Sequence, residues 1–256
     1  MSTQASPEKD IQYINSHVIT LDPVLARGHG LRLHGNRIAE VLQDSAPVAD
    51  DNAVDLQGAT ILPGLVDSHF HLRSLGASTR KTRLQGTDSE EAVARLVAEA
   101  ARALPAGAWV FGRGWDQNDW SRKVFPTHAS LDAAAPSHPV WLSRVDGHAV
   151  WLNAEAMRLL YVEADGRTEK GGEVLLDPQG KPTGVFIDNA MEALEARLPQ
   201  PDLDTLRRDF LQALKLCREA GLTGVHDMGM PPRDLEALRA LNREGLLTLR
   251  TTVYLY

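Results

Sequence analysis

The first sixty residues alternate between apolar and polar positions over short runs, which is the pattern of half-buried strands. Residues 11–20 predict one strand. Two alternating runs within residues 31–41 flank Gly35-Asn36, which predicts a hairpin with a tight turn. Residues 53–56 connect this region to the apolar run that begins at residue 61. The sequence therefore predicts a small all-β unit at this end of the chain.

Helical spacing appears later in the chain. Thr87 and Glu90 have the spacing of a capping box, and apolar residues then recur every three or four positions until a proline and a glycine predict the end of the helix. Short apolar strands are expected at 108–111 and 139–142. The polar, glycine-rich stretch 163–181 predicts a surface excursion around one hairpin.

From residue 202 onward, helices and strands are expected to alternate. An apolar helical stripe closes at Gly221, a residue type that commonly follows a helix C-terminus. This rhythm favours parallel α/β structure of the (β/α)8 type, which usually needs about 250 residues. The expected elements are a helix at 203–217, a strand at 222–225, a helix at 235–241 and a strand at 246–256.

The central stretch of the chain, residues 61–71, is an apolar run that is broken by Pro-Gly and ends in Asp-x-His-x-His. Side chains alternate along a strand, so Asp67, His69 and His71 are expected on one face. Two imidazoles at the end of a buried strand can bind one divalent metal. Asp67 has two interpretations: it accepts a hydrogen bond from a metal-binding imidazole, or it makes a structural hydrogen bond.

This stretch resembles the first barrel strand of the amidohydrolase superfamily, whose members are metal-dependent hydrolases. Three further segments resemble its long-insertion branch, amidohydrolase family 3: Val-Asp-Gly-His-Ala-Val-Trp-Leu-Asn at 145–153, Pro-Thr-Gly-Val-Phe-Ile-Asp-Asn-Ala at 182–190 and Gly-Leu-Thr-Gly-Val-His-Asp at 221–227. The resemblance extends from about residue 11 to residue 256, and the order of the segments is more specific than any one of them.

The resemblance implies an α/β fold, a (β/α)8 TIM-type metallo-hydrolase barrel that is incomplete here. Residues 1–60 would form part of a β-sandwich that C-terminal residues normally complete. Residues 61–256 would form the barrel domain, with a large α+β insertion at about 72–200 between barrel strands 1 and 2. We expect the N-terminal part of a longer enzyme, because only three barrel strands can be counted: 61–70, 222–226 and 246–256. Open strand edges argue against a stable monomer, and a homodimer is among the expected states.

The resemblance also implies the chemistry of the metal site. His69 and His71 would be metal ligands, with Zn2+ the expected metal. The other ligands in the resembled family are a carboxylated lysine, two further histidines and an aspartate on later strands, which this sequence does not supply. Because a catalytic zinc needs at least three protein ligands, His69 and His71 alone would form a weak, open site.

His148 and His226 are the candidate catalytic residues. Each follows or ends an apolar strand, so each is expected to contact substrate or transfer a proton, or else to brace the adjacent segment. Asp146 lies two residues before His148 and is equally compatible with a turn. Asp227 follows His226 and should point the opposite way, so at most one of the two faces the metal. Asp188 stands where the resembled family usually has an acidic residue.

One loop and one thiol complete the candidates. The loop that contains Trp115, Asp116, Gln117 and Trp120 is either the wall of a substrate pocket or a packed part of the insertion. Cys217 lies on an apolar helical stripe and is expected to be a buried, inert thiol. It is the only cysteine, which excludes an internal disulfide and is compatible with a reducing compartment.

Charge and composition exclude some classes of binding partner and cellular location. A formal net charge of −7 argues against a nucleic-acid surface and against binding to anionic membranes. Residues 1–10 are polar without a signal-type apolar core, and no run of about eighteen apolar residues occurs, so a cytoplasmic protein is expected. Nucleophile-elbow, P-loop and dinucleotide-binding motifs do not occur.

The leading hypothesis is a full-length hydrolase that cleaves non-peptide C–N bonds of a small-molecule substrate through a metal-activated water. One alternative is a C–O or P–O bond hydrolase on the same scaffold, because the motif does not define the bond. Another is a truncated or inactive fragment without a complete metal site.

Overall fold

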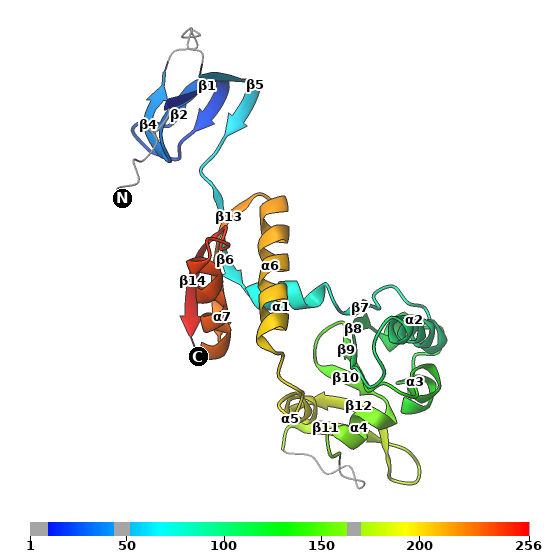
Figure 1. Ribbon diagram of the computed structural model, residues 1–256. Coiled ribbons are helices and arrows are strands. Elements are labelled where there is room, and N and C mark those ends of the chain that lie inside the picture. The colour runs from blue at the N-terminus through cyan, green and yellow to red at the C-terminus, as the bar shows by residue number, and fades with distance from the viewer. Residues whose placement is uncertain (1–9, 44–51, 163–169, 256) are drawn as a thin grey trace. The chain divides into compact units, whose positions relative to one another are not determined.

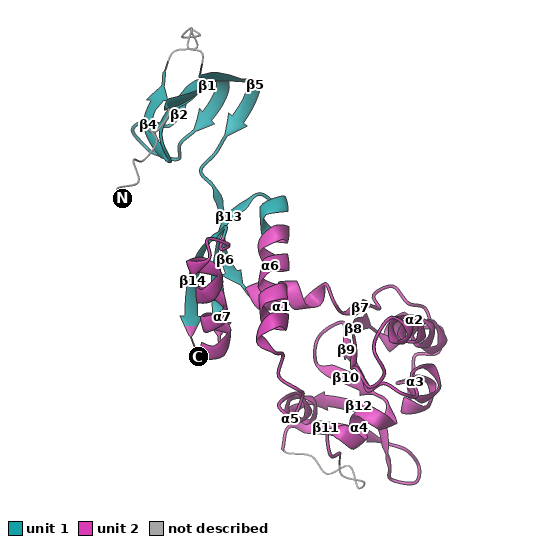
Figure 2. Cartoon of the chain, viewed as in Figure 1, with its two compact units in different colours: residues 1–70, 217–228, 248–254 teal, residues 71–216, 229–247, 255–256 magenta. Residues whose placement is uncertain are grey.

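The computed structural model describes residues 10–43, 52–162 and 170–255. Figure 1 shows the chain by element, and Figure 2 colours its two compact units. Unit 1 comprises residues 1–70, 217–228 and 248–254, and unit 2 comprises residues 71–216, 229–247 and 255–256. The predicted boundary between residues 60 and 61 stays a prediction. In the described residues, no helix is both long and apolar enough to cross a membrane.

The N-terminal part of unit 1 is a five-stranded sheet, which agrees with the predicted all-β unit. Its strand β1 pairs antiparallel with β2 and β3 and parallel with β5. The hairpin expected around Gly35-Asn36 is confirmed, since β3 and β4 pair across that turn. The strands are β1 (Asp10–Ile19), β2 (Arg27–Gly28), β3 (Gly30–His34), β4 (Arg37–Leu42) and β5 (Ala53–Ile61).

The single strand predicted at 61–70 is wrong: the chain leaves strand structure at Leu62 and re-enters it at Leu65. β5 ends at Ile61 and belongs to the N-terminal sheet, whereas β6 (Leu65–Phe70) belongs to a different sheet. The physical reason is the Pro63-Gly64 pair, because proline lacks the N–H that a strand ladder needs.

β6 belongs to a three-stranded sheet with the order β14-β13-β6. β13 (Leu222–Met230) pairs parallel with β6, and β14 (Arg250–Leu255) is the other neighbour of β13. The two expected helices precede these strands as α6 (Leu203–Glu219) and α7 (Pro232–Arg243). β6 is therefore an edge strand, and its Leu65 and Val66 are 57% and 53% exposed.

β6 and β13 approach each other closely where β6 begins. The hydroxyl of Thr223 donates to the carbonyl oxygen of Leu65 at 3.2 Å. A Cβ atom at Gly64 would overlap the side chain of the same threonine. Position 64 therefore requires glycine because no space exists for a side chain.

We predict that Gly64→Ala lowers the free energy of unfolding by about 1–3 kcal/mol, the usual cost of overpacking. Chemical denaturation measures this change. The double variant Gly64→Ala/Thr223→Ala should recover part of the loss, because truncation of Thr223 removes the overlap. Equal stability of Gly64→Ala and the parent chain would contradict the close approach.

Unit 2 contains a six-stranded mixed sheet with the order β11-β12-β10-β9-β8-β7. The strands expected at 108–111 and 139–142 are present, but both begin one or two residues later and extend further. β11 and β12 form a hairpin across the stretch where an excursion was predicted; residues 163–169 of that stretch lie outside the described residues. The strands are β7 (Thr82–Arg83), β8 (Val110–Trp115), β9 (Val140–Arg144), β10 (Ala149–Leu152), β11 (Gly172–Leu176) and β12 (Pro182–Asp188).

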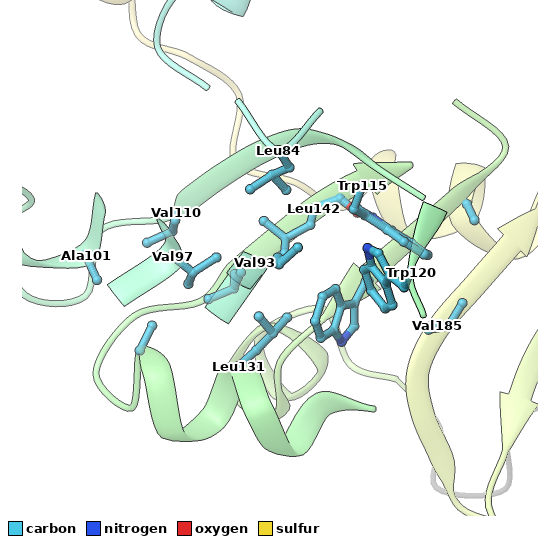
Figure 3. Packing of buried hydrophobic residues seen from close by; sticks show 14 residues of the cluster. Leu84, Val93, Val97, Ala101, Val110, Trp115, Trp120, Leu131, Leu142 and Val185 are labelled. Carbon is cyan, nitrogen blue, oxygen red and sulfur yellow. The ribbon is translucent and has the colours of Figure 1, made fainter. Parts of the chain in front are cut away.

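Each face of this sheet has its own hydrophobic core. On one face, α2 (Glu90–Arg102) and α3 (His128–Ala134) cover a cluster that contains Trp115 and Trp120 (Figure 3). On the other face, α4 (Ala154–Leu159) and α5 (Asn189–Glu195) belong to a cluster that includes Trp141, Val150 and Phe186. The sheet thus separates two cores that share no residue.

The capping box predicted for α2 is wrong in its residues. The N-cap is Ser89, whose side chain accepts from the backbone N–H of Ala92 at 3.2 Å. Thr87 instead donates to the carbonyl oxygen of Leu84, and the Glu90 carboxylate accepts from Ser130. Ser89, two positions after the predicted cap Thr87, therefore caps the helix.

Helix α1 (Leu72–Ser78) packs directly on α6. A Cβ at Gly76 would overlap the backbone of Asp209, so the two helix backbones touch. Arg80 holds the same aspartate with two hydrogen bonds of 2.7 and 2.8 Å, and Asp209 is only 1% exposed. These contacts fix the segment that directly follows the Asp-x-His-x-His sequence.

We predict that Asp209→Ala destabilises the chain by about 1–3 kcal/mol. The variant removes the buried carboxylate, so the Arg80 guanidinium loses its bidentate partner. The cost is moderated because Arg80 is half exposed and can be solvated. Glu236→Ala is the matched control. It removes an exposed pair with Arg239 and should change stability by less than about 0.5 kcal/mol. Similar losses for both variants would refute the anchoring function of Asp209.

Candidate functional site

The two candidate metal ligands lie where β6 changes into helix. His69 is the penultimate residue of β6, and His71 is the N-cap residue of α1, with φ −134° and ψ 86°. Both residues are exposed. The sequence positions of the two imidazoles at a strand end are therefore as predicted, while metal ligation stays a prediction.

Asp67 makes a structural hydrogen bond, while its contact with a metal-binding imidazole stays a prediction. Its carboxylate accepts from the backbone N–H of His69 at 3.0 Å. This bond holds the main chain at the end of β6. Asp67 also contributes to the environment of Cys217, whose pKa is raised mainly by burial and secondarily by the negative charge of this carboxylate. Cys217 is 1% exposed, which agrees with the predicted inert thiol.

His226 lies on β13, next to the strand that carries His69. The register pairs Val225 with Asp67 and Asp227 with Phe70, so His226 is level with the segment that contains His69. Its ring centroid is 6.4 Å from that of Tyr254 on β14. Asp227 is buried and His226 only partly so, as expected for neighbours on opposite faces.

The donor set at this end of β6 fits a divalent metal only in part. Imidazole nitrogen is a common zinc ligand, but a catalytic zinc has at least three protein ligands. In residues 10–43, 52–162 and 170–255, the structure forms no group of three or more His, Cys, Asp or Glu side chains suited to a metal. His69 and His71 are therefore at most a partial ligand set within the part of the chain that is described.

His148 belongs to unit 2 and lies in the turn between β9 and β10. Its Nδ1 is 3.0 Å from a carboxylate oxygen of Asp188, and the backbone N–H of Asp188 donates to its carbonyl oxygen at 2.9 Å. Both side chains are more than half exposed. A carboxylate partner at Nδ1 favours a proton on that nitrogen and leaves Nε2 for another group.

Asp146 and Asp188 shape the backbone around His148. Asp146 accepts from the backbone N–H of His148 at 3.1 Å, and its other carboxylate oxygen is 3.2 Å from Arg144. Asp188 has a φ of 49°, an uncommon value for a residue with a side chain. Strained residues of this kind cluster at functional sites, which directs attention to the pair of Asp188 and His148.

The tryptophan loop after β8 is a packed loop. Trp115 and Trp120 are 0% and 3% exposed, and their ring centroids are 6.1 Å apart. Asp116 caps a short helical turn by accepting from the backbone N–H of Asn118. Gln117 is also buried, so the loop contributes to the core and the packed interpretation holds for its indoles.

Two cations near the β8 end were not identified from the sequence. Arg113 is the fourth residue of β8, and Lys81 lies directly before β7. The pKa of Lys81 is lowered, first because burial disfavours its charge and second because Arg113 repels it. For Arg113, the available sequence signal was a polar residue that follows a short apolar strand, as His148 does.

We predict that Lys81→Met stabilises the chain at neutral pH. A lysine whose folded pKa is lowered is protonated more in the unfolded chain, so stability rises as pH increases toward the unfolded pKa of about 10.4. Removal of Lys81 should flatten that rise. Thermal melts from pH 7 to about pH 10 measure how stability changes with pH. The control is Lys123→Met, which alters an exposed lysine and should retain the pH profile of the parent chain. An unchanged profile for Lys81→Met would contradict the effect of burial.

Comparisons with known proteins identify the fold and then the family. A crystal structure of an uncharacterized metal-dependent hydrolase from Pyrococcus furiosus matches with a TM-score of 0.74 and 26% identity, over 96% of this chain and 50% of that one. The amidohydrolase family model matches residues 52–254. The chain has an α/β metallo-hydrolase fold and belongs to the amidohydrolase family, which confirms the resemblance to amidohydrolase family 3.

Two curated relatives agree with this assignment. Protein LONG AFTER FAR-RED 3 of Arabidopsis thaliana is 30% identical over 86% of this chain and 38% of its own length. N-substituted formamide deformylase of Arthrobacter pascens is 27% identical over 93% of this chain and 46% of its own length. The chain thus spans less than half the length of these two relatives.

Proposed function

We propose that the complete protein is a metal-dependent hydrolase that cleaves non-peptide C–N bonds of a small molecule, with His69 and His71 as metal ligands. The observation that carries this proposal is the pair of imidazoles at the end of β6 in a chain of the amidohydrolase family. The relative named as a formamide deformylase supports the C–N bond as the target.

We also propose the architecture that the resemblance implies. β6, β13 and β14 would be the first three strands of a (β/α)8 barrel, and residues 72–200 an insertion between the first two. The support is the parallel pairing of β6 with β13 and the separate sheet formed by the intervening chain. The ends of barrel strands carry catalytic residues in this fold, which agrees with the position of His69.

The proposed metal is Zn2+, for which imidazoles are common ligands. When bound, the ion would supply a Lewis acid and an activated water. Asp67 holds the backbone of His69 and so orients the end of β6. His226, on the adjacent strand, is assigned to substrate contact. His148, oriented by Asp188, is assigned to proton transfer or substrate contact in its own unit.

We predict that the purified chain binds about one divalent zinc ion through these histidines. His69→Ala and His71→Ala should each weaken binding more than about tenfold, the scale at which even indirect perturbations of metal sites act. Elemental analysis and competition with a chromophoric chelator measure the affinity. The control is His17→Ala, which alters an exposed histidine on β1 and should bind like the parent.

The same samples test the reaction. Metal-loaded protein should release amine from an N-substituted formamide and leave a carboxylic ester and a phosphate monoester intact. Preferred cleavage of either ester would favour the C–O or P–O alternative. Unchanged metal binding in both histidine variants would refute the proposed ligands, and metal binding without hydrolysis of any of the three compounds would favour the inactive-fragment alternative.

The predicted cytoplasmic location, the homodimer and the absence of nucleic-acid and membrane partners stay predictions from the sequence.

A further inference from the structure

The carboxyl ends of four strands lie along the same side of the six-stranded sheet, which is called the carboxyl edge here. β7, β8 and β9 run parallel to one another, and β10 runs antiparallel to both β9 and β12, so β12 shares the direction of β9. Ligands of open α/β sheets bind outside the carboxyl ends of parallel strands. Arg113, Ser143 and Asp188 lie at these ends, and His148 lies in the turn beside them.

Side-chain alternation places these polar residues on one face of the sheet. Arg113, Ser143 and Asp188 each follow, by two positions, an apolar residue of the core that faces α5. The register pairs Arg113 directly with Ser143, and His148 contacts Asp188. The preceding apolar residues are Phe111, Trp141 and Phe186.

Arg113 lies close to the turn that carries His148. A terminal guanidinium nitrogen of Arg113 lies 3.9 Å from the position of a Cβ at Gly147, in the turn that carries His148. In the described residues, Arg113 forms no ion pair, and its charge acts on Lys81. Nearby carboxylates are otherwise engaged, since Asp146 pairs with Arg144 and Asp188 with His148.

Other charges of both signs also act on Lys81. Glu195 opposes the lysine charge, whereas Arg73 and Arg80 add to the repulsion. Both of these arginines are themselves paired, Arg73 with Asp234 and Arg80 with Asp209. Arg113 is therefore the arginine of this group that remains available for a ligand.

We propose that this edge binds a carboxylate group of the substrate, with Arg113 as the principal contact and Lys81 and His148 beside it. The planar fork of a guanidinium matches the two oxygens of a carboxylate. The substrate class is then an amide that bears a carboxylate. The statement that the bound molecule is a substrate rests on the proposed function. Binding of a carboxylate at this site does not depend on that function.

The test uses the full chain without added metal and the probe N-acetylglycine, with N-methylacetamide as the matched neutral amide. Calorimetric titration at low salt should show saturable binding of N-acetylglycine at concentrations up to about 10 mM, in the range of a weak single-group contact. Arg113→Gln should raise the Kd about tenfold or more. Lys81→Met should raise it less, and Arg102→Gln, an exposed charge on α2, should leave it unchanged.

Several results would overturn the proposal: no saturable binding of N-acetylglycine, equal binding by Arg113→Gln and the parent, or equal binding of N-methylacetamide. Tighter binding of inorganic phosphate than of N-acetylglycine would overturn the carboxylate assignment. Thermal melts confirm that each variant is folded. Loss of metal binding in the His69 and His71 variants, tested separately, leaves this result unaffected, so failure of the two proposals can be told apart.

Discussion

The parallel pairing of β6 with β13 is the constraint on which the candidate metal site depends. The hydrogen bond between Thr223 and Leu65 joins residues that are 158 positions apart. The entropy cost of closing such a loop grows only with the logarithm of its length, and the closed segment contains its own sheet with two cores. The end of β6 is therefore held by a strand that follows the whole intervening sheet, and the two strands approach most closely at Gly64, where no space exists for a side chain.

Local patterns predicted most elements, because hydrophobic periodicity reports burial within one helix or strand. The hairpin at Gly35, α6 and α7 are examples. Errors arose where a decision depended on contacts elsewhere. The apolar run through Pro63-Gly64 resembles one strand, yet its halves belong to different sheets. Likewise, Thr87 and Ser89 are both competent caps, and the structure places the N-cap at Ser89.

In the candidate site, too, local features could be predicted from the sequence and contacts between distant residues could not. His69 and His71 could be proposed as metal ligands because their spacing is local, but only together with the Pro-Gly pair, the preceding aspartate and the family resemblance. His148 could be found as well, but its partner Asp188 could not be paired with it, because the contact depends on the register of β10 and β12. Arg113 was missed because an arginine at a strand end resembles an ordinary solvent-facing charge until its neighbours are known.

The two-sided sheet of unit 2 has an evolutionary consequence. The indole-rich core under α2 and α3 stabilises one face, while the polar residues at the strand ends project from the face that packs on α5. Substitutions at Arg113 or His148 would leave the opposite core intact. Such a scaffold can tolerate drift at a few strand-end positions without first acquiring compensating mutations for stability.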